Sequence, residues 1–395
     1  MHLEEIRALE KRYVMQTYGR NEIALVSGEG ARLRDSEGKE YIDLTSGIGV
    51  NCLGYHHPAL SAAISDQAQK LMHCSNLFYS EPMAQVAEHL VKSTGLSRVF
   101  FANSGAEANE AMIKTARKYS SDRYGKDRYK IITLRQSFHG RTMTTLMATG
   151  QDKFHQYFYP LPEGFAYVEA GNLAQFKSCA DEHVCAVIME MIQGEGGVLP
   201  LDQAFVQEVS AYCKAHDILV CVDEVQTGIG RTGTLFCYEQ YGIEPDIVSM
   251  AKGLGGGVPI GAILCGEKCA DTLQPGQHGS TFGGNLLACR AAQTVLSVVD
   301  QPQFLASVKE KGEYIREQLL AMHSPAIREV RGMGLMLGIG VDPQKRSDYV
   351  RALQEKGVLV LTAGEDTIRQ FPVLFLPCNS SLHEECMSPY LIAVR

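Results

Sequence analysis

Several features of other protein classes are missing from this sequence. The 12 cysteines are scattered between Cys52 and Cys386, and no two of them have CxxC spacing. Disulfide frameworks belong to short secreted chains, so this pattern favours free thiols in a reducing cytoplasm. The charged first residues contain no apolar core of a signal peptide, and no apolar stretch is long enough to cross a bilayer. We therefore expect a cytoplasmic protein without a membrane partner.

An excess of positive charge is missing as well. The formal net charge is −8, with 37 Lys and Arg against 45 Asp and Glu. This balance gives no reason to expect nucleic acid as a partner, so substrate anions would have to be bound by individual arginines. No acidic or cysteine cluster has metal-ligand spacing, and we interpret His56 and His57, which precede Pro58, as turn residues. We expect no metal site.

Residues 217–261 contain the main candidates for chemistry. Two apolar, β-branched runs, 218–222 and 246–250, predict buried strands. Asp223 ends the first run, and Lys252 follows the second and precedes a run of glycines. Open α/β sheets bind ligands at strand ends, so Lys252 is a candidate for an amine with a lowered pKa that forms a Schiff base. The alternatives are that Lys252 extends to water and that Asp223 forms a buried ion pair.

The order of the expected elements indicates an α/β fold. The expected helices are 4–15, 58–72, 82–95, 203–216 and 303–322. The expected strands of the main sheet are 98–102, 130–134, 186–189, 218–223 and 246–250. Strands that alternate with helices predict a large domain with a mostly parallel sheet flanked by helices. We place this domain at 50–285 and expect 1–49 and 286–395 to form one smaller α+β domain.

Two stretches suit a flat, anionic cofactor. Residues 103–106 open a helix directly after a strand, where free N–H groups and the helix dipole favour a phosphate group. Ser104 and Glu107 also predict a capping box, which alone would explain this motif. Phe138 could cover a ring and Arg141 could bind a carboxylate, although a surface loop with a core phenylalanine is the alternative.

Other polar residues at strand ends and turns could either contact a ligand or have only a structural role. Glu190 and Glu195 are acids at a strand end, and Ser280 and Thr281 offer hydroxyls that would also serve as helix caps. The GIGRTG stretch at 228–233 matches a dinucleotide fingerprint, but the residues after it are too few and too aromatic for the required helix. We therefore reject a nicotinamide site there.

Six blocks in this order resemble the class III pyridoxal-phosphate-dependent aminotransferases, which act on ω-amino groups. The blocks are NSGAEANEAMIKTAR (103–117), SFHGRT (137–142), MEMIQGEGGV (189–198), VDEVQTGIGRTG (222–233), SMAKGLGGGVPIGA (249–262) and GSTFGGN (279–285). The resemblance extends from about Tyr18 to Arg369 and looks closest to the members that act on acetylornithine. It implies the pyridoxal-phosphate-dependent transferase fold type I and a homodimer with shared active sites.

The resemblance also implies roles for individual residues. Lys252 would bind pyridoxal 5'-phosphate as a Schiff base and move a proton, and Asp223 would face the ring nitrogen. The other cofactor contacts would come from Ser104, Gly105, Ala106, Phe138, Glu190, Gln226 and, across the dimer, Thr281. The substrate contacts would come from Arg141, Glu195, Arg369 and, across the dimer, Ser280. In this scheme Arg369 binds the α-carboxylate of glutamate, and Glu195 pairs with Arg369 when the other substrate is bound.

The implied reaction moves the terminal amino group of N2-acetyl-L-ornithine to 2-oxoglutarate by a ping-pong mechanism, a step of arginine biosynthesis. Ile48 stands where ornithine aminotransferases carry a tyrosine that binds free ornithine, which disfavours that substrate. Succinylornithine, N-acetyl-lysine-like compounds, ornithine and 4-aminobutyrate remain alternative substrates. An aminomutase or racemase on the same fold is an alternative reaction.

The end of the chain departs from the family pattern. Family members continue after the position of Arg369 with a Pro-Pro-Leu strand end and a charged helix, whereas this tail has three prolines and little helical period. The tail after 370 is therefore atypical, and the placement of Arg369 depends on it. A cofactor-binding dimer that is inactive because of this tail is a second hypothesis of a different class.

Overall fold

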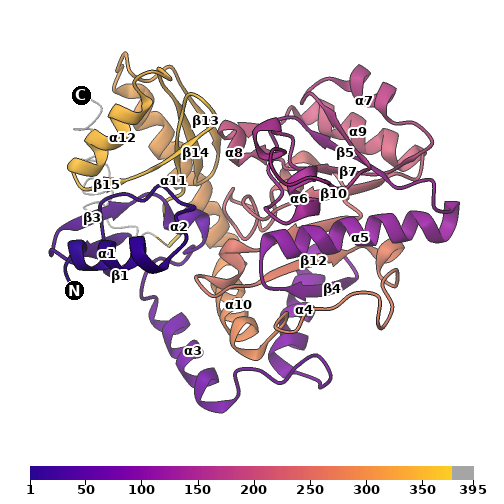
Figure 1. The fold of residues 1–395 in the computed structure, drawn as a ribbon, viewed down its shortest axis with the longest axis horizontal. Coiled ribbons are helices and arrows are strands. Elements are labelled where there is room, and N and C mark those ends of the chain that lie inside the picture. Colours follow the sequence, from indigo (N-terminus) through magenta and orange to yellow (C-terminus); the bar gives the residue numbers. More distant parts are fainter. Residues whose placement is uncertain (376–395) are drawn as a thin grey trace.

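The computed structural model describes residues 1–375 and confirms the α/β class (Figure 1). Its larger part is built on a 7-stranded sheet with the order β4-β12-β11-β10-β7-β5-β6. The strands are β4 (Arg98–Ala102), β5 (Lys130–Leu134), β6 (Phe165–Val168), β7 (Val184–Met189), β10 (Leu219–Asp223), β11 (Ile247–Met250) and β12 (Gly261–Cys265). The five strands expected from the sequence are all present, whereas β6 and β12 were not predicted.

The sheet is mostly parallel, as predicted. Only β12 runs against its neighbours, pairing antiparallel with β11 and with β4. Gly261 begins β12, and a Cβ atom at this position would lie 2.2 Å from the carbonyl oxygen of Ser104. Glycine is therefore required where β12 passes the start of the helix that follows β4.

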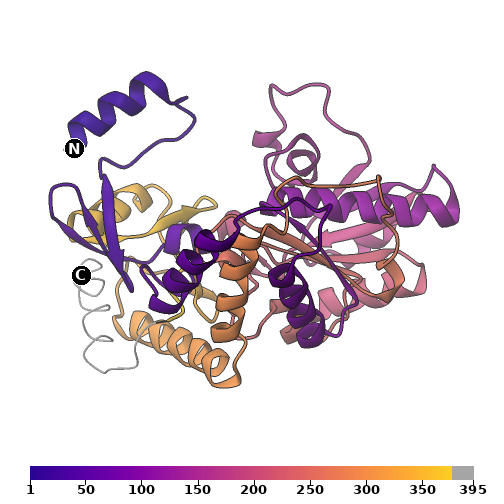
Figure 2. The same ribbon diagram turned by 90° about the horizontal axis from the view of Figure 1, so that it is seen from below.

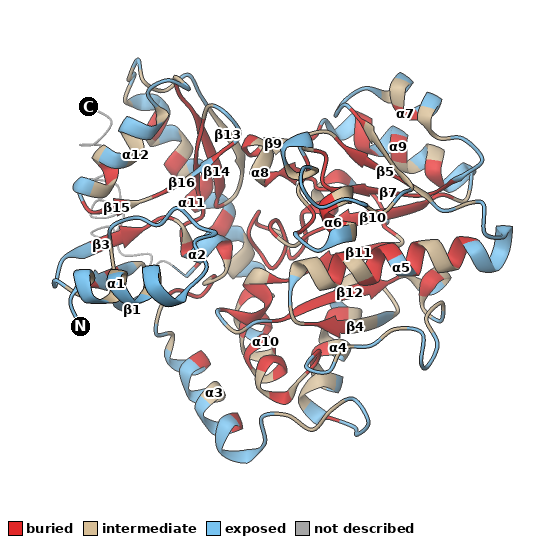
Figure 3. Cartoon of the chain, viewed as in Figure 1, coloured by how far each residue is buried: buried red, intermediate tan, exposed pale blue. Residues whose placement is uncertain are grey.

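Helices cover both faces of this sheet. Alternate residues of β10 face opposite sides: Leu219 and Cys221 lie in one apolar cluster with α5, and Val220 and Val222 lie in the other with α9. The main helices are α3 (Pro58–Lys70), α4 (Glu81–Thr94), α5 (Gly105–Tyr124), α9 (Gln203–Ala215), α10 (Leu286–Val299) and α11 (Pro302–Ala321). Figure 3 colours the strands of this sheet mostly as buried. Strands that are buried on both faces need continuous apolar runs, as these have.

Two smaller sheets lie outside the large one, and the first of them joins the first and last parts of the described chain. One has the order β1 (Leu25–Glu29), β2 (Arg32–Asp35), β3 (Glu40–Asp43) and β15 (Val358–Leu359). The other has the order β13 (Glu329–Met333), β14 (Met336–Gly340), β17 (Thr367–Gln370) and β16 (Leu361–Ala363). Since β15 pairs with β3, the N-terminal strands belong beside the C-terminal ones.

The proposed division into two domains stays a prediction. Helix α10, which that division assigned to the smaller domain, packs against α3 and α4 beside the large sheet (Figure 1). A boundary at residue 285 would separate α10 from these partners. Helix α1 (Leu3–Tyr13) has no buried residue and stands apart from the rest in Figure 2.

The remaining elements are short. They are α2 (Ser46–Gly49), α6 (Met143–Ala148), α7 (Leu173–Cys179), α8 (Gly194–Gly197), α12 (Arg346–Glu355), β8 (Ile192–Gln193), β9 (Leu199–Pro200) and the 3-10 turns η1 (Asp152–Phe154), η2 (Cys237–Tyr241), η3 (Lys252–Gly255) and η4 (Glu267–Cys269). No helix within residues 1–375 is long and apolar enough to span a membrane.

The start of the atypical tail is fixed to the rest of the chain. The Phe371 N–H donates to the Leu44 carbonyl and the Leu374 N–H to the Cys52 carbonyl, each at 2.7 Å. Strand β17, which carries Arg369, pairs with both β14 and β16. These contacts fix the position of the Arg369 backbone, which the sequence alone did not determine. The rest of the tail, 376–395, lies outside the described residues.

Candidate active site

A cavity of about 430 Å³ opens at the carboxyl ends of the central strands. Its volume lies in the range of small-ligand sites. Among the predicted site residues, it is lined by Ser104, Gly105, Ala106, Phe138, Arg141, Glu190, Asp223, Gln226 and Lys252. Glu195, Arg369, Ser280 and Thr281 are not part of its wall. The cavity therefore brings together most of the predicted cofactor residues, which come from α5, three strand ends and the loop after β5.

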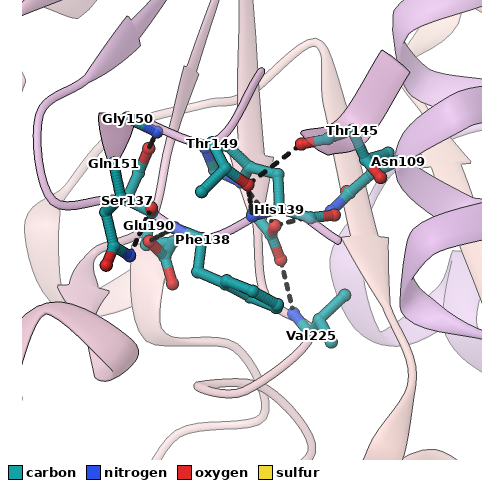
Figure 4. A network of polar contacts seen from close by, with 11 residues as sticks. Asn109, Ser137, Phe138, His139, Thr145, Thr149, Gly150, Gln151, Glu190 and Val225 are labelled. Carbon is teal, nitrogen blue, oxygen red and sulfur yellow. Dashed lines mark hydrogen bonds and ion pairs between the residues drawn. The ribbon is translucent and has the colours of Figure 1, made fainter. Parts of the chain in front are cut away.

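Asp223 ends β10 and is fixed by three donors. The residues that supply them, Asn109, His139 and Val225, are labelled in Figure 4. Its Oδ2 accepts from Asn109 Nδ2 at 2.7 Å and lies 2.7 Å from His139 Nδ1, and its Oδ1 accepts from the Val225 N–H at 3.0 Å. The residue is only 3% exposed. These contacts stabilise a carboxylate that lines the cavity, where it can face a cationic group of a ligand.

Asn109 and His139 are contacts that the sequence interpretation missed. Asn109 also donates from Nδ2 to the His139 carbonyl at 2.8 Å, which joins α5 to the loop behind the cavity. The His139 N–H donates to Thr149 Oγ1 at 2.9 Å, and its side chain is fully buried. The sequence places His139 beside Phe138 in a turn after a strand, which could have indicated a site residue. The sequence interpretation used this turn only for the ring of Phe138 and the cation of Arg141.

Lys252 is held in an unusual backbone conformation at the cavity wall. Its φ is +41°, a left-handed value that a non-glycine residue adopts at a cost. Its amine makes no hydrogen bond or ion pair with another residue in the range 1–375. Burial lowers the pKa of Lys252, although the charges of Glu195, Asp223 and Glu190 act in the opposite direction. The lowered pKa increases the fraction of neutral, nucleophilic amine.

Glu190 is a second buried acid close to Asp223. Its Oε2 accepts from the Phe138 N–H at 3.0 Å, and burial followed by the charge of Asp223 raises its pKa well above the usual range. Two buried carboxylates in one site cannot both carry charge easily. Burial and the neighbouring charge of Asp223 thus favour the neutral form of Glu190, and its hydrogen bond fixes the backbone of Phe138.

The start of α5 offers free donors to the cavity. Ser104 caps this helix by accepting from the Glu107 N–H at 3.2 Å, and Glu107 Oε2 accepts from the Asn103 N–H at 2.6 Å. The predicted Ser104 cap is confirmed, but Glu107 accepts from Asn103 and not from Ser104, so the capping box itself is incomplete. The N–H groups of Gly105 and Ala106 donate to no other residue of the described chain. Unfilled donors at a helix N-terminus suit a phosphate group.

Arg141 lies over aromatic rings near the cavity mouth. Its Cζ is 5.4 Å from the ring centre of Phe138 and 4.1 Å from that of Phe154. The guanidinium is exposed, so it remains accessible to an anionic group. This arrangement supports both predicted roles, a ring beside the cavity and a carboxylate-binding cation, and both roles remain predictions.

Glu195 and Arg369 form an ion pair between α8 and β17. Arg369 Nη1 donates to Glu195 Oε1 at 2.5 Å, and Gln226 Nε2 lies 3.4 Å from the same oxygen. Burial alone would raise the pKa of Glu195, but the charge and hydrogen bond of Arg369 outweigh it and the pKa is lowered. The pairing that the resemblance implied is therefore present.

Ser280 and Thr281 do not line this chain's cavity. Ser280 Oγ accepts from Asn103 Nδ2 at 3.1 Å, and Thr281 is exposed. Both were predicted to act across a dimer, which a single chain does not test. Ile48 is also exposed and lies in α2, where Gly47 and Ile48 have left-handed φ values of 61° and 67°.

The residues present fit pyridoxal phosphate. The cavity offers free N–H donors for a phosphate, an unpaired amine for an aldehyde, and a fixed carboxylate for a ring nitrogen. The N–H donors, the amine and the carboxylate come from different parts of the sequence, so only folding brings them close together.

Comparison with known proteins identifies close relatives. Residues 13–387 match the family described as aminotransferase class-III. An acetylornithine aminotransferase from Haemophilus ducreyi is 50% identical over 378 residues, 95% of each chain. A succinylornithine transaminase from Yersinia pseudotuberculosis is 43% identical over 375 residues, 92% of this chain and 91% of the other.

Two solved structures show the same fold. The N-acetylornithine aminotransferase from Stenotrophomonas maltophilia superposes with a TM-score of 0.84 at 37% identity, covering 98% of both chains. The ornithine aminotransferase from Toxoplasma gondii superposes with a TM-score of 0.95 at 30% identity, covering 100% of this chain and 95% of the other.

Proposed function

The chain belongs to the class-III aminotransferases, which depend on pyridoxal phosphate, and from this premise we propose that it transfers the terminal amino group of N2-acetyl-L-ornithine to 2-oxoglutarate. The products would be N-acetylglutamate 5-semialdehyde and glutamate. The observation that carries the proposal is the cavity that joins Lys252 to Asp223, with the Glu195–Arg369 pair beside it.

The proposed chemistry divides between the cofactor and this chain's residues. When bound, pyridoxal phosphate supplies an aldehyde for amino-group transfer and a ring that accepts electrons from the substrate carbon. The carboxylate of Asp223 would stabilise a positive charge on the ring nitrogen of the cofactor. The N–H groups of Gly105 and Ala106 would bind its phosphate. Lys252 Nζ, whose pKa is lowered, accepts the proton from the reacting carbon and returns it.

A ping-pong reaction requires one site to accept two unlike amino donors. We propose that Arg141 binds the carboxylate of the acylated ornithine while Glu195 stays paired with Arg369. When 2-oxoglutarate or glutamate binds, its α-carboxylate would replace Glu195 at the guanidinium of Arg369. Glu195 is the more exposed partner of the pair, with a side chain 31% exposed against 4% for Arg369, so it is the partner that can move away.

The choice of substrate is supported by two observations. The relatives that share most sequence with this chain in the comparisons above are named for acetylornithine and succinylornithine. Ile48 is an exposed aliphatic residue, which offers no hydroxyl to a free α-amino or carboxylate group. The first choice is therefore N2-acetylornithine, with succinylornithine as the second.

A substrate panel tests the proposal. The loaded enzyme is given 2-oxoglutarate with acetylornithine, succinylornithine, ornithine or 4-aminobutyrate, and glutamate formation is measured. We expect the highest kcat/KM with acetylornithine. If the bound cofactor's absorption does not change with any donor, the protein is an inert cofactor-binding dimer instead. If turnover does not need 2-oxoglutarate, the protein is a mutase or racemase.

We also propose that the active unit is a cytoplasmic homodimer. Leu77 is 88% exposed and Phe282 is 59% exposed, and Asn76 Nδ2 connects their two segments by donating to the carbonyls of Ser280 and Gly283. An apolar patch of this kind favours burial against a second copy. Light scattering should give the mass of two chains. The described cysteines are all free, which supports a reducing compartment.

A further inference from the structure

Arg231, in the GIGRTG stretch that the proposed chemistry does not use, is a buried charge without an acidic partner. It is 2% exposed, and burial lowers its pKa to about 10. Within the described residues, its Nη2 atom has no hydrogen-bond partner and no carboxylate pairs with it. Burying a guanidinium without an acidic partner costs free energy, so the presence of Arg231 at this position needs a structural or functional explanation.

Arg231 connects the loop after β10 to two other segments of the chain. Its Nη1 donates to the Leu335 carbonyl at 3.1 Å and to the Pro372 carbonyl at 2.5 Å. The Leu335 N–H donates back to the Arg231 carbonyl at 3.0 Å. Arg231 lies eight residues after Asp223 in the sequence, and Pro372 lies two residues after the end of the strand that carries Arg369.

The same guanidinium shares an aromatic ring with Arg369. Phe371 is fully buried, and its ring centre lies 5.6 Å from Arg231 Cζ and 5.2 Å from Arg369 Cζ. Both distances lie within the range of cation–π contacts, which are strongest where water is excluded. Ser46 also donates a hydrogen bond to the Phe371 carbonyl, so the backbone on this side of the ring is fixed.

Arg369 has few other contacts that would hold its guanidinium in place. Its one close ionic partner is Glu195, and its Nε atom has no hydrogen-bond partner in the described chain. In the proposed reaction Glu195 leaves when a substrate carboxylate arrives. The orientation of Arg369 at that moment must then come from β17, from Phe371 with the residues that fix it, and from Gln226, whose Oε1 accepts from Arg369 Nη1 at 3.4 Å.

We propose that Arg231 is a positioning residue for Arg369. It holds the Pro372 carbonyl and the Phe371 ring, and through them it keeps the carboxylate-binding guanidinium aimed at the cavity while Glu195 is displaced. This inference rests on the proposed function, because it assumes that Arg369 binds the α-carboxylate of glutamate and 2-oxoglutarate. Arg231 itself touches neither substrate nor cofactor in this account.

The test compares two KM values in the holoenzyme of Arg231→Lys. Lysine keeps the charge but loses the planar group that reaches two carbonyls and stacks on a ring. We expect the KM for 2-oxoglutarate and the Kd of unreactive glutarate to rise about tenfold, which corresponds to about 1.4 kcal/mol. The KM for acetylornithine should stay within about twofold, because that substrate uses Arg141.

A matched control and a second variant keep the test decisive. Arg316→Lys removes an arginine that also donates to two backbone carbonyls, those of Val330 at 2.5 Å and Gly332 at 2.7 Å, so it should lower stability without separating the two KM values. Phe371→Leu keeps an apolar side chain and removes the shared ring, and it should reproduce the selective effect. If Arg231→Lys does not fold, the two KM values of Phe371→Leu test the proposal in its place.

The outcomes separate this inference from the proposed function. If Arg369→Lys leaves the KM for 2-oxoglutarate unchanged, the proposed role of Arg369 is wrong and the inference fails with it. If Arg369→Lys raises that KM but Arg231→Lys and Phe371→Leu do not, the inference alone is overturned. Equal changes in both KM values would show Arg231 to be a purely structural contact and would also overturn it.

Discussion

The Asp223 pocket and the Glu195–Arg369 pair are neighbours, but they are held together in different ways. Asp223 sits at the end of a strand in the seven-stranded sheet and accepts from three donors around its two oxygens. Glu195 and Arg369 come from a short helix and from a strand of a smaller sheet, and one close hydrogen bond joins them. The first arrangement fixes a charge, whereas the second can exchange one partner for another.

This difference matches the demands of a reaction with two substrates. Every half-reaction needs the same cofactor charge, so a rigid network is suitable at Asp223. Only one half-reaction needs a free guanidinium, so a pair that opens is suitable at Arg369. The predictions below test whether the two parts of the site really differ in this way.

Removing the amine of Lys252 should have the largest effect, and it should act on both half-reactions. We expect Lys252→Ala to lower both single-turnover rates by at least about 10³-fold, because proton transfer and covalent binding are lost together. Stopped-flow absorbance of the bound cofactor measures each rate. Lys92→Ala, on the exposed side of α4, is the control and should change neither. A large loss in only one half-reaction would contradict the account.

Glu195→Gln should act on the two half-reactions unequally. Without its charge, position 195 no longer neutralises Arg369, so the guanidinium remains available when acetylornithine binds. We expect the glutamate half-reaction to keep its KM within about threefold and the acetylornithine half-reaction to lose about tenfold in kcat/KM. Steady-state kinetics with each substrate varied give both values. Equal effects on the two substrates would remove the proposed exchange of partners.

Glu224, next to Asp223, should make stability depend on pH. It is fully buried, and its oxygens accept from Thr227 Oγ1 at 2.5 Å and from the Tyr238 N–H at 2.8 Å. Burial raises its pKa from 4.5 to about 7, against these hydrogen bonds. The folded chain then holds a proton that the unfolded chain releases, so this contribution is present below pH 4.5 and is lost as pH rises through about 7.

Thermal unfolding from pH 4.5 to pH 7.5 measures this contribution. Glu224→Gln should flatten the fall in stability by about 3 kcal/mol across the window. Glu88→Gln, at an exposed position of α4 that pairs with Lys92, is the matched control and should leave the slope unchanged. A slope that stays the same in Glu224→Gln would show that this acid is charged in the folded protein at neutral pH.

The smallest expected effect is a gain in stability at Ile48. A β-branched residue at φ 67° is strained, and glycine adopts this conformation freely. We expect Ile48→Gly to stabilise the fold by about 1 kcal/mol after the loss of some apolar contact. Urea unfolding measures the change. Val50→Gly is the control, since Val50 has φ −89° and should lose stability when replaced.

The sequence predicts the rigid half of the site well. Apolar β-branched runs identify the strands, and the carboxyl ends of neighbouring strands lie at one edge of a sheet. That rule alone brings Asp223 and Lys252 together. The capping pattern at Ser104 likewise predicts the helix start that presents Gly105 and Ala106 to the cavity.

The contacts behind these residues could not be predicted in the same way. Asn109 lies 114 residues from Asp223 in the sequence, and the carbonyl oxygens bound by Arg231 lie 104 and 141 residues from it. Such contacts depend on how helices and loops pack in three dimensions, and no local pattern encodes them. The antiparallel strand β12 was missed for a related reason, because its glycine-rich approach suggests a loop.

Covalent capture of the cofactor tests the central claim most directly. The protein is incubated with pyridoxal phosphate, reduced with borohydride and digested, and the modified peptide is identified by mass spectrometry. The account predicts one modified residue, Lys252, with the yield at limiting cofactor falling sharply in Asp223→Ala. Modification of another lysine, or a yield that does not depend on Asp223, would contradict the claim that these two side chains form one pyridoxal-phosphate site.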